Sequence, residues 1–372
     1  MPTTSHARRS YLPEPQAERR GIALCLSGGG FRAALFHLGA LRRLNELGIL
    51  SQIRTLTAVS GGSTIAAHLA NHAADWRRPM CTAEWEQTIA EPFRAFTSRN
   101  LSAWPVLKGW LLWWSNAGVE ELAHRCDTRL RLSNVTLERL KNDADWSFCA
   151  VNLVTGEQQV LNGHLSPDWP VARAVAVSSC FPGFFRPYCE TEPHRIALVD
   201  GGVDDNLGVE PVWRSHETLL VSDGGDPLRP EWSRSALWLV RAAFVTWAQG
   251  QDARKRWLLS NFIDGELKGT YWGIDSSVEH YPQTPPSFGY SQELSRDVIA
   301  VIRTDYDAFS DAEAAVLENH GYFLAEAAAS AHLTTIDRRS APFVIPHPAW
   351  LSERKIRDAL RDSSKKRLLG RH

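Results

Sequence analysis

The sequence contains no apolar run of the eighteen or so residues that a membrane-spanning helix needs. Residues 1–20 include four arginines, but they lack the apolar stretch of a signal peptide. These two absences predict a protein with neither a leader nor a membrane anchor. We therefore expect a cytoplasmic location, with contact to a membrane only at its surface.

Strong net charge is also missing, since 41 Lys and Arg residues nearly balance 42 Asp and Glu residues. A net charge of −1 gives no overall field that would attract nucleic acid or an anionic membrane, although local charge can differ. We expect no nucleic-acid partner. The 44% hydrophobic and 22% charged content suits one large α/β domain with a substantial core.

Closely spaced cysteine pairs are absent too. The six cysteines are Cys25, Cys81, Cys126, Cys149, Cys180 and Cys189. Without a C-x-x-C spacing they argue against a zinc site and a disulfide framework, and they fit a reducing cytosol. The sequence also lacks the spacing of a calcium-binding loop. We therefore predict neither a metal nor an organic cofactor.

What the sequence does contain is a serine in the form of a nucleophile elbow. The motif runs Ala58-Val59-Ser60-Gly61-Gly62. Residues 53–59 before Ser60 predict a buried strand, and the alanine-rich residues 64–74 after it predict a helix. A serine at such a turn is held in a strained conformation and needs small neighbours two positions away. Ala58 and Gly62 meet that need, although the usual first glycine is missing.

A second strand-to-helix turn lies about thirty residues upstream. It runs Ser27-Gly28-Gly29-Gly30-Phe31-Arg32. The apolar residues 22–26 predict the strand, and leucines from Leu35 to Leu47 on one face predict a helix that ends at Gly48. Three consecutive glycines let the backbone approach a ligand closely, with amide N–H groups pointing outward at a helix N-terminus. Such amides suit an oxyanion hole.

The same glycines also fit the dinucleotide-binding fingerprint G-x-G-x-x-A, over residues 28–33. The next strand ends in Ser60 rather than in the acid that would bind a ribose, so this alternative is weaker but stays open. A phosphate-binding P-loop is excluded, because no Gly-Lys-Ser/Thr follows the glycines.

The third motif places a carboxylate after a strand. The apolar residues 196–199 lead to Asp200, and two glycines follow. Asp200 could take the proton of Ser60 directly, without a histidine between them, if both side chains lie at strand ends within hydrogen-bond reach. The alternative is an aspartate that merely forms a turn. For Asp204 and Asp205 we expect solvent-facing turn roles.

These three motifs, in this order, resemble the patatin-like phospholipases, whose hydrolytic site is a Ser-Asp dyad with a glycine-rich oxyanion loop. The resemblance covers roughly residues 21–225 and, in a further stretch, residues 302–322. It implies a three-layer α/β fold, with a central, mainly parallel sheet flanked by helices. It also implies a hydrolase domain at 21–330, between a tail at 1–20 and a basic segment at 331–372.

Carried over to this sequence, the family pattern makes Ser60 the nucleophile and Asp200 its base. The oxyanion loop would be formed by Gly28, Gly29 and Gly30, with the amide of Gly61 as a further donor. The implied substrates are membrane phospholipids or lysophospholipids, whose carboxylic esters are cleaved to release fatty acid. A generic serine esterase that acts on small soluble esters is the alternative.

Arg32 and the histidines have open roles. Arg32 could meet a lipid phosphate with paired N–H donors, or could be a surface residue in the first turn of a helix. His320 and His347 lie late enough in the chain for a Ser-Asp-His triad, but His320 falls in a helix-like run that favours a structural role. His37 and His68 lie inside predicted helices, and we expect them to be packed.

Two tryptophan-rich stretches, about 83–145 and 226–292, interrupt the predicted sheet, and we expect helical insertions there. The first holds the aromatic run Trp104 to Trp114, which is too short to cross a bilayer. Its composition fits a membrane-interface or lid element, or equally a buried packing helix. The basic tail from Ser352 fits a solvated face or weak docking to anionic lipid.

Overall fold

The computed structural model describes residues 18–72, 78–112, 114–140, 144–191, 195–225, 238–282 and 288–365. Several predicted features therefore lie outside the described residues. These are most of the N-terminal tail, Trp113, Trp232, much of the proline-rich 281–288 stretch, and Lys366 and Arg367.

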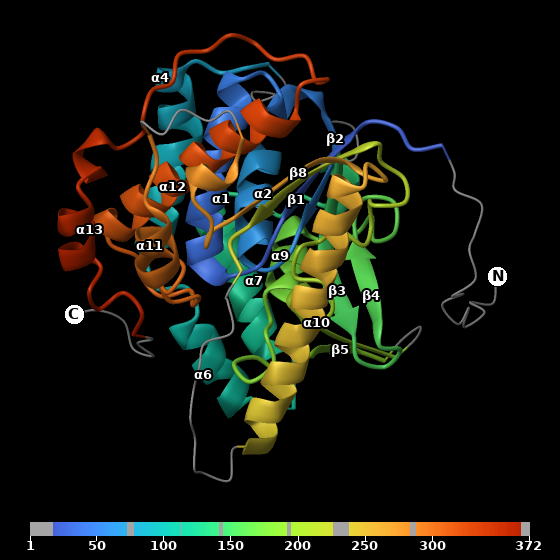
Figure 1. The fold of residues 1–372 in the computed structure, drawn as a ribbon. Helices are drawn as coiled ribbons and strands as arrows, with labels where there is room; N and C mark the ends of the chain where they lie inside the picture. The colour runs from blue at the N-terminus through green and yellow to red at the C-terminus, as the bar shows by residue number, and fades with distance from the viewer. Residues whose placement is uncertain are drawn as a thin grey trace.

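One mixed sheet organises the described chain (Figure 1). Its strands are β1 (Ile22–Leu26), β2 (Ile53–Ala58), β3 (Asp145–Asn152), β4 (Glu157–Leu161), β5 (Tyr188–Glu190), β6 (Ile196–Asp200), β7 (Thr218–Asp223) and β8 (Lys268–Gly273). The order is β5-β6-β3-β2-β1-β7-β8, with β4 also paired to β3. The pairs among β3, β2, β1, β7 and β8 are parallel, whereas β4, β5 and β6 pair antiparallel. The predicted mainly parallel sheet is confirmed.

Helices cover both faces of this sheet (Figure 1). The helices are α1 (Gly30–Glu46), α2 (Gly61–Asn71), α4 (Thr82–Trp85), α5 (Glu91–Thr97), α6 (Ala103–Leu111), α7 (Ala117–Leu130), α8 (Leu137–Leu140), α9 (Val171–Ser178), α10 (Trp238–Ile263), α11 (Gln292–Leu294), α12 (Asp311–His332) and α13 (Glu353–Ala359). β1 shows the layering, because its side chains alternate between the two faces. Leu24 and Leu26 join the main core with α1, and Ala23 and Cys25 join a smaller core with Leu258 of α10.

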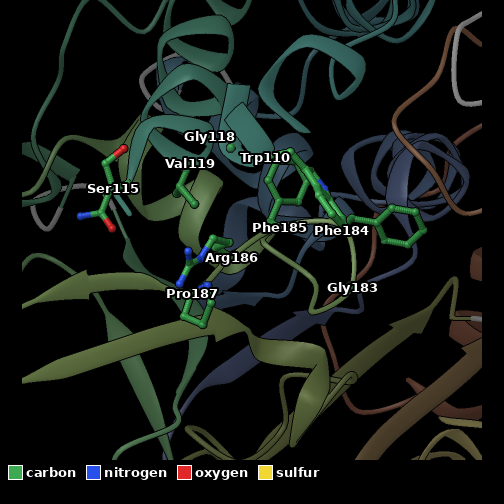
Figure 2. Close-up of a pocket in the computed structure, with 11 residues that line it drawn as sticks. Trp110, Ser115, Gly118, Val119, Gly183, Phe184, Phe185, Arg186 and Pro187 are labelled. Carbon is green, nitrogen blue, oxygen red and sulfur yellow. The ribbon is translucent and has the colours of Figure 1, made fainter. Parts of the chain in front are cut away.

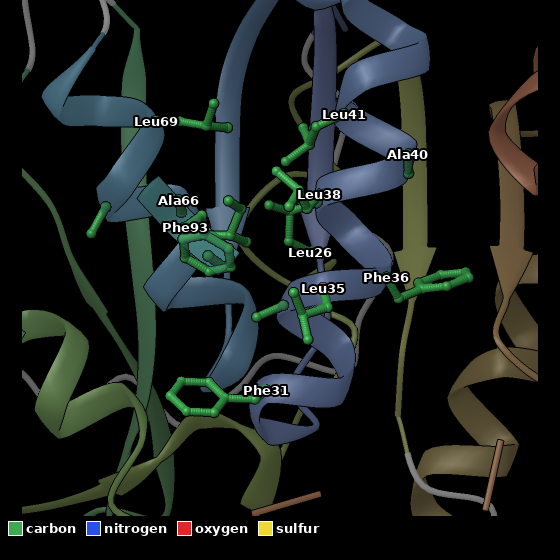
Figure 3. Packing of buried hydrophobic residues seen from close by; sticks show 14 of the residues in the cluster. Leu26, Phe31, Leu35, Phe36, Leu38, Ala40, Leu41, Ala66, Leu69 and Phe93 are labelled. Carbon is green, nitrogen blue, oxygen red and sulfur yellow. The ribbon is translucent and has the colours of Figure 1, made fainter. Parts of the chain in front are cut away.

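The local predictions around the two glycine turns agree with the structure. β1 and α1 follow the predicted order, and α1 ends just before Gly48, which has the left-handed φ of +71° that favours glycine there. Leucines of α1 face the sheet, where they pack with α2 and with Phe93 (Figure 3). α2 begins at Gly61, three residues earlier than predicted, because the turn passes directly into the helix.

The register of β3 brings two distant strand ends together. Phe148 pairs with both β2 and β4, so these two strands lie on opposite edges of β3. Ala150 pairs with both β4 and β6, so β6 lies on the same edge as β2. β2 runs parallel to β3 and ends opposite Phe148, while β6 runs antiparallel and ends with Asp200 opposite Ala150. The C-terminal ends of β2 and β6 therefore approach each other head to head.

Two glycines allow α1 and α12 to pack backbone against backbone. A Cβ atom at Gly39 would lie 1.8 Å from the carbonyl oxygen of Glu318, and one at Gly321 would lie 1.9 Å from that of Phe36. No side chain fits at such distances, so α12 holds α1 closely against the sheet.

We predict that Gly39→Ala lowers the free energy of unfolding by about 1 to 3 kcal/mol or more, because the added methyl overpacks the α1–α12 contact. The matched control is Gly250→Ala in α10, where a Cβ meets nothing within 4 Å. That change should raise stability by up to about 1 kcal/mol. Thermal unfolding of the two variants checks this, and equal midpoints would contradict the close packing.

Candidate active site

Ser60 occupies a strained turn between β2 and α2. Its φ of 50° and ψ of −115° lie in a region that residues other than glycine rarely adopt. Close packing around the turn explains the small neighbours. A Cβ at Gly62 would lie 2.4 Å from the carbonyl oxygen of Leu26, and Ala58 is fully buried. The sharp turn expected from the sequence is present, and alanine fits where glycine is usual.

The end of α9 holds the turn of Ser60 and the end of β6 in one place. The amide of Ser60 donates to the carbonyl oxygen of Ser178 at 3.1 Å, and the amide of Asp200 donates to that of Cys180 at 3.2 Å. The Ser178 hydroxyl also accepts from the Ser60 amide, at 3.1 Å. Two residues that are two positions apart, Ser178 and Cys180, thus fix both backbones.

Asp200 lies beside Ser60 in a nearly dry environment, with only 2% of its surface exposed. Its Oδ1 accepts the amide of Gly202 at 2.8 Å. Burial raises the pKa of Asp200 to about 7, against the opposing effects of the nearby Ser60 side chain and of the Gly202 amide. The structure therefore brings together the two side chains that the sequence motifs single out, with a carboxylate that exchanges its proton near neutral pH.

A tyrosine hydroxyl is the second polar neighbour of Ser60. The Tyr306 oxygen lies 3.4 Å from Ser60 Oγ, and it donates its own proton to Ser179 Oγ at 3.0 Å. Sequence reasoning gave neither residue a role. The only signal was their place in two stretches that carried the family resemblance, at residues 174–187 and 302–322.

The glycine loop lies directly against the Ser60 turn. A Cβ at Gly28 would lie 3.1 Å from the Ser60 Cβ, and one at Gly61 would lie 2.1 Å from the carbonyl oxygen of Gly30. Gly29 and Gly30 have φ values of 139° and 58°, which glycine adopts readily. The two strand-to-helix turns can approach this closely only because these positions lack side chains.

The amides of this loop are not equivalent. The N–H of Gly28 donates to the carbonyl oxygen of Asn206 at 3.1 Å, so it is engaged within the protein. This corrects the expectation that all three loop glycines offer amides to a ligand. Within the described chain, no acceptor is found for the amides of Gly29, Gly30 and Gly61.

Arg32 does not have the role we considered for it. Its side chain is fully buried, and its guanidinium donates to the carbonyl oxygens of Gly224, Ala300 and Ile302 at 2.7 to 3.3 Å. The phosphate-binding interpretation is therefore wrong in this structure. The same burial also excludes the surface alternative, because Arg32 is an internal link between the end of β7 and the segment after α11.

The histidines are structural in this arrangement. His320 contacts the carbonyl oxygen of Ile274 at 2.8 Å, and burial lowers its pKa to about 4. His37 bridges Ser222 and the carbonyl oxygen of Ser27, and His68 contacts that of Ile89. Burial lowers the pKa of both to about 4 as well, which agrees with the expected packing roles. His347 contacts Glu318.

Asp204 and Asp205 form the turn after Asp200, as expected, but Asp205 is not solvent-facing. It is fully buried and accepts the amides of Leu207 and Glu210. Arg254 of α10 pairs with both aspartates, at 3.4 and 3.2 Å.

The tryptophan run is exposed rather than packed. Trp104, Trp110 and Trp114 have 49%, 70% and 70% of their surface accessible. The buried-helix alternative for this run is therefore wrong. Trp110 instead borders a cavity of about 410 Å³ with Val119, Phe184 and Phe185, between α6, α7 and the loop that follows Cys180 (Figure 2).

The described residues offer neither a metal-binding cluster nor a membrane-spanning helix. No group of three or more His, Cys, Asp or Glu side chains is arranged to hold a metal ion in this part of the chain. No helix among the described residues combines the length and apolar character that crossing a bilayer requires.

Comparison with known proteins places this geometry in a family. A model of the patatin-like phospholipases matches residues 24–213. The sequence matches none of the curated proteins with which it was compared. Among solved structures, the chain is similar to VipD from Legionella pneumophila, at 13% identity, covering 85% of this chain and 67% of VipD with a TM-score of 0.43.

The chain is also similar to human GIVD cytosolic phospholipase A2 in complex with methyl gamma-linolenyl fluorophosphonate. That match has 13% identity and a TM-score of 0.49, and it covers 84% of this chain and 58% of the human one. The chain thus spans about 58% to 67% of the lengths of these two proteins.

The structure and the family match both disfavour the dinucleotide-binding alternative. In the structure the amide of Phe31, at the start of α1, donates to the carbonyl oxygen of Asp305, and the backbone of Thr304 fills the space beside Gly30. Protein backbone therefore occupies part of the surface that a pyrophosphate would need. Because the family model spans just over half of the chain and includes the glycine loop, Ser60 and Asp200, the chain belongs to the patatin-like phospholipase family, whose chemistry is lipid hydrolysis.

Proposed function

We propose that the chain is a lipid acyl hydrolase of the phospholipase A or lysophospholipase type, with Ser60 as nucleophile and Asp200 as its general base. The observation that carries this proposal is the position of Ser60, in a strained turn at the end of β2, beside the buried carboxylate of Asp200 at the end of β6, whose pKa burial raises to about 7. A base is most effective when its pKa is close to the working pH. No histidine is required between the two groups.

In the first half of the reaction, Asp200 accepts the Ser60 proton while Oγ attacks the ester carbonyl carbon. The carbonyl oxygen becomes an oxyanion, for which the amides of Gly29, Gly30 and Gly61 are the available donors. The tetrahedral intermediate collapses as the bond to the alcohol oxygen breaks. Asp200 returns its proton to that oxygen, which leaves an acyl group on Ser60.

In the second half, water gives a proton to Asp200 and its oxygen attacks the acyl carbonyl carbon. Collapse of this intermediate breaks the bond to Ser60 Oγ, which regains the proton from Asp200, and the fatty acid is released. The cycle uses protein groups and water alone. Donors of the oxyanion type are each worth about 3 to 4 kcal/mol in transition-state stabilisation.

Exposed apolar side chains near the site support a lipid substrate and transient contact with a membrane surface. We call these residues the apolar rim: Trp104, Leu107, Trp110 and Leu111 of α6, Phe184 of the loop after α9, and Trp238, Leu239, Val240 and Phe244 of α10. Phe181 stacks on Phe244 at 6.4 Å between ring centroids, and Phe184 borders the same cavity as Trp110. The loop at 181–187 thus joins both helices directly after the residues that hold Ser60 and Asp200.

Exposed clusters of aromatic and aliphatic side chains are typical of surfaces that contact a lipid interface. Figure 1 shows α6 and the start of α10 at the same end of the molecule. A small soluble ester would not require such a rim. This observation favours a lipid hydrolase over a generic serine esterase.

We predict that Ser60→Ala and Asp200→Asn each lower turnover of a carboxylic ester by about 10⁴-fold or more, because each removes a group that takes part in the bond changes. His320→Ala should retain most activity per folded molecule, because His320 contacts only buried groups. Product release from phosphatidylcholine vesicles and from p-nitrophenyl butyrate measures this. Large loss in His320→Ala together with a tolerated Asp200→Asn would replace the dyad with a triad.

The pH dependence should follow Asp200. Only its ionised form accepts the Ser60 proton, so kcat/KM on a soluble ester should fall about tenfold per pH unit below pH 7. The buried histidines do not account for such a limb, since their pKa values are about 4. Initial rates between pH 4 and 9 test this. A rate that stays flat down to pH 5 would contradict an Asp200 base with a raised pKa.

The apolar rim should matter for vesicles but not for dissolved esters. Trp110→Ser with Trp238→Ser should lower vesicle binding and phosphatidylcholine hydrolysis roughly tenfold or more and leave p-nitrophenyl butyrate turnover unchanged. Ile263→Ser is the matched control, because Ile263 is 84% exposed at the opposite end of α10. Equal effects of the rim and control changes, or no effect of either, would favour the generic esterase.

A further inference from the structure

The helix α10 contains one buried polar residue among its described positions, Gln251. Of the described α10 side chains, only Ala248, Gln251 and Leu258 are buried. Burial of an amide costs free energy unless its polar atoms find partners. Gln251 finds them outside its own helix, in the loop that follows Asp200.

Gln251 binds three points of that loop. Its Oε1 accepts the amide of Asn206 at 3.0 Å, and its Nε2 donates to the carbonyl oxygens of Gly202 at 3.3 Å and Asp204 at 3.0 Å. The side-chain amide is thus used on both its donor and its acceptor side. Gln251 thus binds the loop at Gly202, Asp204 and Asn206.

Both ends of this loop reach the reacting groups. The amide of Gly202 donates to Asp200 Oδ1 at 2.8 Å and so orients the carboxylate. The carbonyl oxygen of Asn206 accepts the amide of Gly28, the first glycine of the triplet, at 3.1 Å. Gln251 therefore contacts Gly202, whose amide orients the base, and Asn206, which anchors the glycine loop.

A second α10 side chain binds the same residue, Gly202. Trp247 Nε1 donates to the carbonyl oxygen of Gly202 at 2.6 Å, and the Trp247 ring packs on Phe181 at 5.9 Å between centroids. Two donors from one helix thus bind the carbonyl of Gly202, while the amide of Gly202 binds Asp200. Holding its carbonyl oxygen fixes the position of Gly202, the residue whose N–H binds the carboxylate.

We propose that Gln251 and Trp247 are positioning residues of the hydrolytic site, which hold Asp200 and the glycine loop in their working geometry. This inference rests on the proposed function of Ser60 and Asp200. It gives α10 a second role besides carrying part of the apolar rim. Neither residue touches the substrate or the reacting atoms.

Removal of these contacts should change catalysis in a way that general destabilisation does not. A misplaced base and oxyanion loop lower kcat, while binding of a small ester that does not contact α10 is retained. The Gly202 hydrogen bond also lowers the pKa of Asp200. Its loosening should raise that pKa, so the acid limb of the rate profile should move to higher pH.

The test compares two variants of α10 with p-nitrophenyl butyrate as substrate. Gln251→Met, which keeps the size of the side chain but removes its hydrogen bonds, should lower kcat roughly 10- to 100-fold with KM within about twofold of the original value. Trp247→Phe, which keeps the aromatic packing and removes one donor, should lower kcat roughly three- to tenfold. Both should shift the acid limb upward.

Two matched controls lie on the same helix. The Thr246 hydroxyl donates to the carbonyl oxygen of Ala242 within α10, and Trp257 packs on Trp213, so Thr246→Val and Trp257→Phe should leave kcat and the pH profile unchanged. If both Gln251→Met and Trp247→Phe keep the kcat and the acid limb of the unmodified protein, the inference is overturned. If Gln251→Met lacks a cooperative thermal transition, the Trp247→Phe profile decides.

Labelling with an alkyl fluorophosphonate tests the function of Ser60 and the positioning role of α10 separately. Labelling of the unmodified protein at Ser60, and none in Ser60→Ala, supports the proposed function, and slower labelling of Gln251→Met supports the positioning role. Labelling at Ser60 with equal rates in all α10 variants would overturn only the positioning role. Absence of labelling at Ser60, with activity retained in Ser60→Ala, would overturn the proposed function and the inference together.

Discussion

The candidate site depends on one feature of the sheet, the head-to-head meeting of β2 and β6 on the same edge of β3. In an all-parallel sheet, the C-terminal ends of two strands come close together only when the strands lie side by side. Here β6 runs against β2, so Asp200 arrives from the opposite direction and lies next to the turn of Ser60. Ser178 then binds the backbone of Ser60, and Cys180 binds that of Asp200, which holds the two side chains near each other without a third catalytic group.

Both Ser60 and Asp200 lower the stability of the folded chain. Ser60 has a left-handed φ, which costs about 1 to 3 kcal/mol. Asp200 has a pKa of about 7 instead of 3.8, so the folded chain holds its proton more tightly than the unfolded chain does. Its contribution to the free energy of unfolding therefore falls as pH rises from about 4 to 7, by about 4 kcal/mol in all. The backbone contact of α1 with α12 and the large core on that face offset such costs.

The sequence was sufficient where the cause of a feature is local. The strand before Gly28, the helix that ends at Gly48 and the tight turn at Ser60 follow from hydrophobic spacing and from glycine positions a few residues apart. It was insufficient where the cause is a distant contact. Nothing near Arg32 indicates that carbonyl groups from residues 224, 300 and 302 surround it, and nothing near Gly28 indicates that Asn206 takes its amide. Tyr306 and Gln251 were missed for the same reason, because their partners lie 246 and up to 49 residues away.

The position of α10 suggests why the lipid-facing surface and the reacting groups are close together in this fold. The described helix begins with exposed Trp238 and Leu239, and about two and a half to three and a half turns later reaches Trp247 and Gln251, which hold the loop of Asp200. Lys255 adds a buried ion pair to Asp223 at 2.6 Å, so the helix is also fixed to the end of β7 beside the glycine loop. The same helix therefore carries part of the apolar rim and the side chains that hold the loop after Asp200.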